Sequence, residues 1–221
     1  MADHPADRVL EAVGLAVTGA HSPMLRPTTV SVGTGVVHGV VGDPGHGHTA
    51  LALALGGRLV PTDGTVMLDD DPDLDRLARA VALVDVPGVS EPDGVLPLGT
   101  VIGEELAMAG RPADRTAVGA WAPLSLLDTR IEDVPAAERV ALLLRLTAQR
   151  PGTRFLVLTM PERYGALPAD WEPVAAELAA QGFGVLVTMG LAAATHAHVA
   201  ISAIGGADGP PETGGHAAEE A

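Results

Sequence analysis

The stretch from Val40 to Leu59, VVGDPGHGHTALALALGGRL, constrains the fold of this 221-residue chain more than any other. A β-branched run opens it, Gly42, Gly45 and Gly47 interrupt the run, and a helical pattern of alanine and leucine follows. Glycines at such a turn let backbone N–H groups converge on an anion at the helix N-terminus. The stretch therefore predicts a buried strand, an anion-cradling loop and a helix as one unit.

This loop fits the phosphate-loop frame G-x-x-x-x-G-K-[ST] except at the lysine, where His48 stands. Histidine is shorter than lysine and mostly neutral at pH 7, and losing a charge-assisted contact to phosphate costs about 1.5–3 kcal/mol. All 13 basic residues are arginine, so no displaced lysine can substitute. We interpret the loop as a degenerate nucleotide site with ATP and Mg²⁺ as doubtful ligands, made of Gly42, Gly45, Gly47, His48 and Thr49. A loop kept only for its geometry, with solvated histidines, is the alternative.

Apolar runs downstream alternate with helical patterns, which indicates right-handed crossovers and a mainly parallel sheet. Short β runs between Val9 and Val41 predict a small antiparallel unit. Further strands are predicted at 64–70, 80–86, 153–159 and 183–189, and helices at 47–59, 100–109, 136–150 and 172–181. The fold class is therefore α/β. We expect one domain over 1–204, with a helical subdomain at about 95–150, and a disordered acidic tail over 205–221.

Composition excludes several classes of function. The absence of cysteine excludes a disulfide framework, a thiolate metal site and a cysteine nucleophile. A net charge of −15 argues against nucleic-acid binding, which needs a basic face. No uncharged apolar run of 18 residues and no signal-peptide pattern occur, so we expect a cytoplasmic protein.

Three segments carry a resemblance to a known family. The segment Gly56–Asp70, GGRLVPTDGTVMLDD, resembles the region after the phosphate loop in ATP-binding cassette (ABC) ATPases. The segment Thr100–Pro112, TVIGEELAMAGRP, resembles the start of the helical subdomain in that family. The stretch Val134–Glu162 resembles the family's signature helix and the strand that follows it. The resemblance covers most of residues 8 to 204. It implies a P-loop NTPase fold with an N-terminal antiparallel β patch. It also implies a membrane-spanning transporter subunit and a second, active cassette as partners, at the inner face of the cell membrane.

The residues that carry out chemistry in that family are replaced here. Val134–Glu138 reads VPAAE where the family has LSGGQ or LSGGE. Thr159 and Met160 stand where the family has a magnesium-binding aspartate and a catalytic glutamate, and neither side chain can replace those functions. The switch histidine is Met189. The glutamine expected near Asp85 or Val86 is absent, as is an adenine-stacking aromatic before the loop, for which His21 is a weak substitute.

These departures predict a degenerate cassette subunit, a pseudo-ATPase with weak or no ATP binding and no hydrolysis. The sequence pattern assigns no catalytic residue and no metal-binding residue. Glu162, two residues beyond the base position, is interpreted as a cap of the following segment rather than as a substitute base. Two alternatives stay open: a non-nucleotide scaffold or regulatory protein that keeps the cassette shape, and an active hydrolase with an unrecognised base.

Two other patterns favour structural interpretations. The pairs His46-x-His48 and His196-x-His198 have metal-ligand spacing, but no third ligand accompanies either pair, so solvated loop histidines are the preferred interpretation. The acidic run from Asp69 to Asp75 lacks the glycine and the terminal glutamate of a calcium loop. We interpret it as an exposed turn followed by a helix N-terminus.

Overall fold

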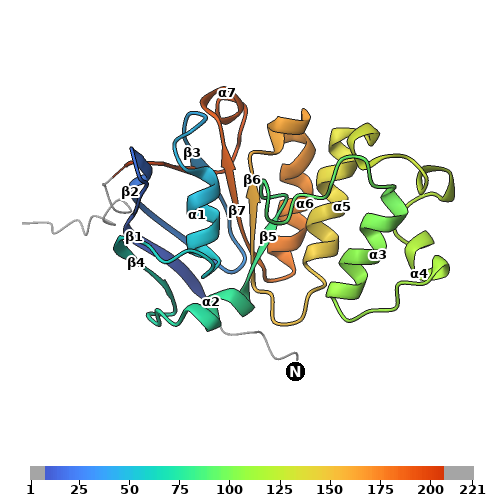
Figure 1. The fold of residues 1–221 in the computed structure, drawn as a ribbon, viewed down its shortest axis with the longest axis horizontal. Helices are drawn as coiled ribbons and strands as arrows, with labels where there is room; N and C mark the ends of the chain where they lie inside the picture. The colour runs from blue at the N-terminus through green and yellow to red at the C-terminus, as the bar shows by residue number, and fades with distance from the viewer. Residues whose placement is uncertain (1–7, 207–221) are drawn as a thin grey trace, which may run out of the picture.

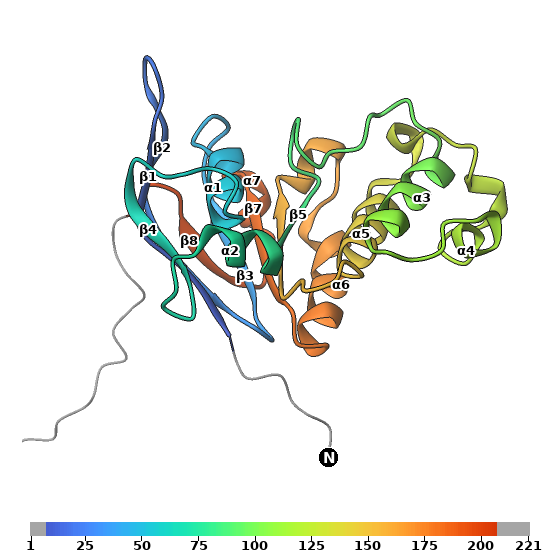
Figure 2. The same ribbon diagram turned by 60° about the horizontal axis from the view of Figure 1, so that its bottom comes forward.

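The computed structural model describes residues 8–206. Its strands form two sheets (Figures 1 and 2): a three-stranded antiparallel sheet of order β2-β1-β4, and a five-stranded parallel sheet of order β5-β6-β7-β3-β8. The strands are β1 (Val9–Thr18), β2 (Pro23–Gly33), β3 (Val37–Val41), β4 (Asp63–Leu68), β5 (Val81–Val84), β6 (Phe155–Thr159), β7 (Gly184–Met189) and β8 (Ala200–Ala203).

Seven α-helices and three short 3₁₀ helices connect these strands within the described range. They are α1 (His48–Leu55), α2 (Leu74–Ala80), α3 (Leu98–Met108), α4 (Arg115–Gly119), η1 (Leu124–Leu126), η2 (Ile131–Asp133), α5 (Ala136–Thr147), η3 (Pro161–Tyr164), α6 (Pro168–Ala180) and α7 (Leu191–Ala194). Helices α3, α4 and α5 lie to one side of the parallel sheet, away from the antiparallel sheet (Figure 1).

Strands β5, β6 and β7 of the parallel sheet are buried on both faces because they are continuous apolar runs. Phe155 and Val157 of β6 pack on one face, in the same core as the leucines of α1 and the antiparallel sheet. Leu156 and Leu158 pack on the other face with α5 and α6. Strand alternation thus divides the interior into two cores, and α1 lies between the two sheets.

This order brings the carboxyl ends of three parallel strands together. β3 lies between β7 and β8, and β7 lies between β3 and β6, so the chain leaves β3, β6 and β7 at one edge of the sheet. The loop from β3 to α1 starts at this edge. Ligands of open α/β sheets bind outside the carboxyl ends of the strands, which makes this edge the candidate site.

The sequence-based element boundaries needed several corrections. The helix predicted over 47–59 ends at Leu55, because two glycines follow and Gly57 adopts a φ of +64°. The helix predicted to start at 172 begins four residues earlier at Pro168, where the Asp170 side chain accepts the Leu167 N–H. Strand β8 was not predicted, since only four residues form it and none of them is buried.

The predicted start of the helix over 100–109 is wrong by two residues. Thr100 lies inside α3, which begins at Leu98, and Pro97 precedes the helix without a side-chain cap. The predicted tail begins close to the end of the described residues, so nearly all of it lies outside them. Within 8–206, no helix is long and apolar enough to cross a membrane.

Candidate functional site

The loop from β3 to α1 has the backbone that its glycines permit. Gly45 and Gly47 adopt φ values of +89° and +102°, which residues with a side chain rarely adopt. A Cβ on Gly47 would lie 2.3 Å from the carbonyl oxygen of Met24 in β2. Strand β2 therefore packs directly against the loop, and only glycine fits at position 47.

His48 turns back into its own loop. Its side chain is only 4% exposed, and its Nε2 lies 3.0 Å from the carbonyl oxygen of Gly42. Since a carbonyl only accepts, Nε2 carries the proton, and Nδ1 has no partner. Burial lowers the pKa of His48, although the bonds to the Gly42 and Asp43 backbone and the charge of Glu162 oppose this. The imidazole at the lysine position is thus neutral at pH 7, and its one N–H is already bonded to the protein's own backbone.

A pocket of about 390 Å³ opens in front of the loop. Four of the five predicted nucleotide-site residues line it: Gly45, Gly47, His48 and Thr49. Gly42 does not; its N–H donates to the carbonyl oxygen of Met189 and continues the sheet. The other walls come from the β1–β2 turn and from Met160. His21 is absent from the lining, so the structure gives no support to a stacking role for it.

The strand ends below the loop carry buried hydroxyls. Thr159 ends β6 and lies in register with Thr188 of β7, and strand alternation directs both side chains to the α1 side of the sheet. They are 1% and 0% exposed, and neither hydroxyl has a hydrogen-bond partner. Met160 follows with a φ of +46°, an uncommon conformation for a side chain of this size. No carboxylate occupies the positions 159 and 160.

Glu162 does not cap the segment that follows it, where Asp170 accepts the Leu167 N–H, so that interpretation is wrong. Its Oε1 accepts the backbone N–H of Gly190 at 2.6 Å, across to the loop that follows β7. Its Oε2 is buried and has no partner. Helix η3, which contains Glu162, starts after Met160 without a side-chain cap. The carboxylate thus joins the ends of β6 and β7, close enough to His48 to influence its pKa.

A buried ion pair that sequence reasoning missed lies at the end of β5. The guanidinium of Arg139 in α5 donates two hydrogen bonds to Asp85, one of them at 2.8 Å, and both side chains are 3% exposed. The ring of Tyr164 lies 3.7 Å from the Arg139 guanidinium, and its hydroxyl donates to Glu91 at 2.6 Å. Arg163 donates to Glu91 and to the carbonyl oxygen of Asp85.

This network joins the end of β5, the start of α5 and η3. Asp85 stands where the family resemblance leads one to expect a glutamine. A signal was present in the sequence, because an aspartate at the end of an apolar strand needs a partner once it is buried. The identity of that partner, 54 residues away, was not readable from spacing.

The histidine pairs do not converge on a metal. His48 faces Gly42, whereas His46 Nδ1 accepts the Asp43 N–H at 3.3 Å. The exposed His198 bonds to Glu172. Within the described residues, no group of three or more His, Cys, Asp or Glu side chains could hold a metal ion. Contrary to the preferred interpretation of solvated histidines, His48 is buried.

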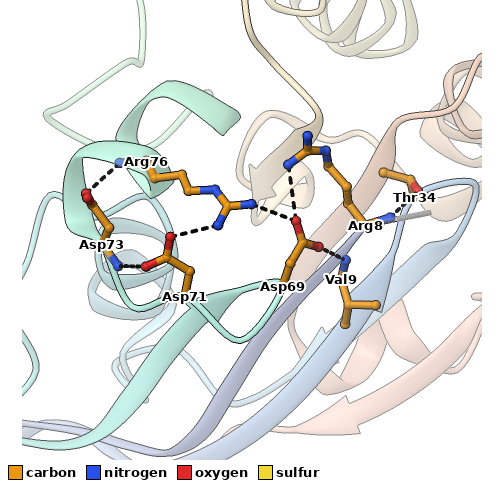
Figure 3. Close-up of polar contacts among 7 residues, drawn as sticks. All are labelled: Arg8, Val9, Thr34, Asp69, Asp71, Asp73 and Arg76. Atoms are coloured by element: carbon orange, nitrogen blue, oxygen red, sulfur yellow. Dashed lines mark hydrogen bonds and ion pairs between the residues drawn. The ribbon is translucent and has the colours of Figure 1, made fainter. Parts of the chain in front are cut away.

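The acidic run forms an arginine-paired turn and a helix cap (Figure 3). Asp69 Oδ2 accepts from both Arg8 and Arg76, and Asp71 accepts from Arg76 at 2.7 Å. The Asp73 side chain caps α2 by accepting the Arg76 N–H. These partners confirm the interpretation as a turn with a helix N-terminus, and they tie the start of β1 to the end of β4.

Comparisons with known proteins identify the fold. No protein-family model and no curated protein sequence matches the chain. Its structure is similar to a nucleotide-free ATP-binding cassette from an ABC transporter, with a TM-score of 0.63 and 13% identity over 89% of this chain and 87% of that chain. A putative ABC transporter ATP-binding protein from Pyrococcus furiosus gives a TM-score of 0.63 and 16% identity over 89% and 97%.

A third similar structure is a bacterial Atm1-family ABC exporter with ATP bound, at a TM-score of 0.59 and 16% identity. The match covers 82% of this chain and 34% of that chain. At sequence identities this low, the structural similarity establishes a shared fold, while function has to be argued from the site. The chain has the fold of an ABC transporter ATP-binding cassette. The predicted α/β class, with a parallel sheet and an N-terminal antiparallel patch, is confirmed.

Proposed function

We propose that this chain is an ATP-binding cassette subunit of an ABC-type transporter that binds ATP weakly or not at all and does not hydrolyse it. The observation that carries the proposal is the bond from His48 Nε2 to the carbonyl oxygen of Gly42. In a phosphate loop this position supplies a cation to the bound phosphates. Here it supplies a neutral ring whose one proton is already donated within the loop.

The rest of the site supports the same conclusion. No arginine lines the pocket in front of the loop, so phosphate charge there meets no side-chain cation, only the hydroxyls of Ser22 and Thr49, backbone N–H groups and the helix N-terminus. Thr159 and Met160 offer neither a carboxylate for Mg²⁺ nor a base for water. The carboxylate of Glu162, which follows these two positions, has an oxygen committed to the Gly190 N–H. Binding is therefore weakened, and hydrolysis lacks its chemical groups.

A cassette of this kind acts through partners. We propose a membrane-spanning transporter subunit and a second cassette with its own lysine and base, at the cytoplasmic face of the membrane. The support is the fold, together with the similar structures, which come from ABC transporters. The partner cassette would then carry out the turnover, and this chain would contribute the surface against which it closes.

Titration with a fluorescent ATP analogue, with and without Mg²⁺, tests the proposal. We expect no micromolar binding by the native protein and about tenfold or greater tightening in His48→Lys. His46→Lys is the matched control, because it adds the same charge two residues away at an exposed position and should gain little. Micromolar binding by the native protein, or ATP turnover at the rate of an ordinary cassette, would overturn the proposal.

A scaffold or regulatory protein without nucleotide is the second candidate. The close packing of β2 against Gly47 and the buried imidazole favour it, since together they satisfy the loop without a ligand. If His48→Lys folds as the native protein does and still binds no analogue, this candidate replaces the first. In that case the loop acts as a structural turn.

A further inference from the structure

A second pocket, of about 570 Å³, lies next to the one in front of the loop, and Met160 lines both. Its walls are mainly apolar and include Met160, Leu167 and Leu191. The last two side chains are more than half exposed, at 54% and 55%. The pocket is formed by the start of the loop after β3, by η3, by the start of α6 and by the loop and short helix after β7, and it is large enough for a small organic molecule.

The ionisable groups in this pocket point to a cation. Asp43, Glu162 and His196 line it, and no arginine does. Glu162 contributes the carboxylate whose Oε2 is buried without a partner. A buried carboxylate oxygen that lacks a donor is costly, so a donor group brought by a ligand would be favoured there. A metal ion is not the candidate, because no suitable ligand group occurs within residues 8–206.

One oxygen of the Glu162 carboxylate is anchored beside the pocket, and the other is not. The Gly190 N–H fixes Oε1 at 2.6 Å, and a Cβ at position 190 would lie 3.3 Å from this oxygen, closer than most side chains approach. The backbone of Met160 is held at a positive φ on the wall of the pocket. Local strain of this kind persists only where the surrounding structure imposes it, and it is concentrated at functional sites.

We infer that this pocket binds a small organic cation, a protonated primary amine with an apolar body. The ammonium group donates to Glu162, and Asp43 adds favourable charge at the pocket wall. Because the terminal torsion of a glutamate is soft, a small rotation of the carboxylate presents Oε2 to the ligand. The apolar body packs on Met160, Leu167 and Leu191. This inference does not depend on whether the adjacent loop binds nucleotide.

The test is an NMR titration of the native protein with phenethylammonium, followed at the Gly190 amide. This amide reports on the site because it donates to Glu162. We expect saturable shifts with phenethylammonium. The neutral analogue 2-phenylethanol should bind at least about tenfold more weakly. Glu162→Gln should lose this preference for the cation. Glu177→Gln is the matched control, since it removes the same charge from an exposed carboxylate on α6 and should leave binding unchanged.

A second variant, which fills the pocket, keeps the test decisive if Glu162→Gln does not fold. Ala192 is exposed and lines the pocket, so Ala192→Trp should fold normally and block binding. Equal binding of the amine and the alcohol, or unchanged binding in Glu162→Gln, would overturn the inference. A Gly190 amide that shifts with protein concentration rather than with amine would also overturn it, because the pocket would then hold a second chain.

Discussion

Two polar clusters lie at the carboxyl edge of the parallel sheet, and they differ in how completely their groups are partnered. At the end of β5, the charges of Asp85 and Arg139 are buried and joined by two hydrogen bonds. Below the phosphate-type loop, the hydroxyls of Thr159 and Thr188 and the Nδ1 of His48 are buried with no partner. The first cluster pairs its opposite charges within the fold and leaves only the Nε of Arg139 without a partner. The second retains hydrogen-bonding capacity that the protein does not use.

This difference separates what holds the molecule together from what remains of a site. Buried charges without partners are too costly to persist, so the ion pair is required by the fold once either member is present. Unpartnered neutral groups cost less, about 1–3 kcal/mol each, and persist more easily. The edge below β3, β6 and β7 therefore keeps the layout of a ligand site with reduced polarity, whereas the edge beside β5 is a structural junction.

Breaking the ion pair should have the largest effect on stability. Asp85→Ala leaves the Arg139 guanidinium buried and unpaired, which we expect to lower the free energy of unfolding by about 3–5 kcal/mol. Urea denaturation followed by circular dichroism measures this change. The β5 end, α5 and η3 all contact the network, so the loss should appear as one cooperative transition at lower urea.

The double variant Asp85→Leu with Arg139→Met is the control for this prediction. Replacing both members of a buried pair by apolar residues is often neutral or stabilising, so the double variant should recover most of the lost stability. If it is as unstable as Asp85→Ala, the pair itself is net stabilising. The contrast drawn between the two clusters would then be weaker.

Removing an unpartnered hydroxyl should have the opposite sign and a smaller size. Thr188→Val replaces a fully buried, unpartnered hydroxyl by a methyl group of similar shape, and we expect about 1 kcal/mol of added stability. Thr28→Val is the matched control, because the equally buried Thr28 hydroxyl donates to the Arg26 carbonyl at 2.7 Å and accepts the Gly205 N–H at 3.0 Å. This control should lose about 1 kcal/mol.

Chemical denaturation of both threonine variants decides the point. Destabilisation of Thr188→Val by as much as Thr28→Val would mean that the Thr188 hydroxyl has a partner in solution, such as a bound water. The cluster below the loop would then be satisfied after all. Solvent, rather than a missing ligand, would then account for the hydrogen-bonding groups of this cluster, in contrast to the ion pair.

The sequence predicted the features that depend on neighbouring residues. The unit from Val40 to α1 follows from a β-branched run, turn glycines and an alanine–leucine helix, all within 20 residues. The α/β class follows from the alternation of such units. Most errors occurred at element ends, where one or two residues decide, as at Gly57. Strand β8 was missed because a short exposed strand carries no burial pattern.

The candidate site was predictable in its position but not in its contacts. The frame around His48 located the loop, and the family resemblance marked Thr159, Met160 and Met189 as departures. The return of His48 onto Gly42, the bond from Gly190 to Glu162, and the Asp85–Arg139 pair all depend on tertiary packing. Such contacts between distant residues leave no periodic signal, so sequence spacing could not reveal them.

The smallest predicted effect concerns pH and sharpens the account of His48. Burial lowers its pKa below the ordinary 6.5, so the unfolded chain binds more protons than the folded protein between the lowered pKa and 6.5. Stability should therefore rise with pH through that window and level off above 6.5. Burial also lowers the pKa of His38, which contributes in the same direction.

Urea denaturation between about pH 5 and pH 8 should show a shallower rise of stability with pH in His48→Gln than in the native protein. An unchanged slope would mean that the imidazole reaches solvent, and the loop would then be free to meet a phosphate.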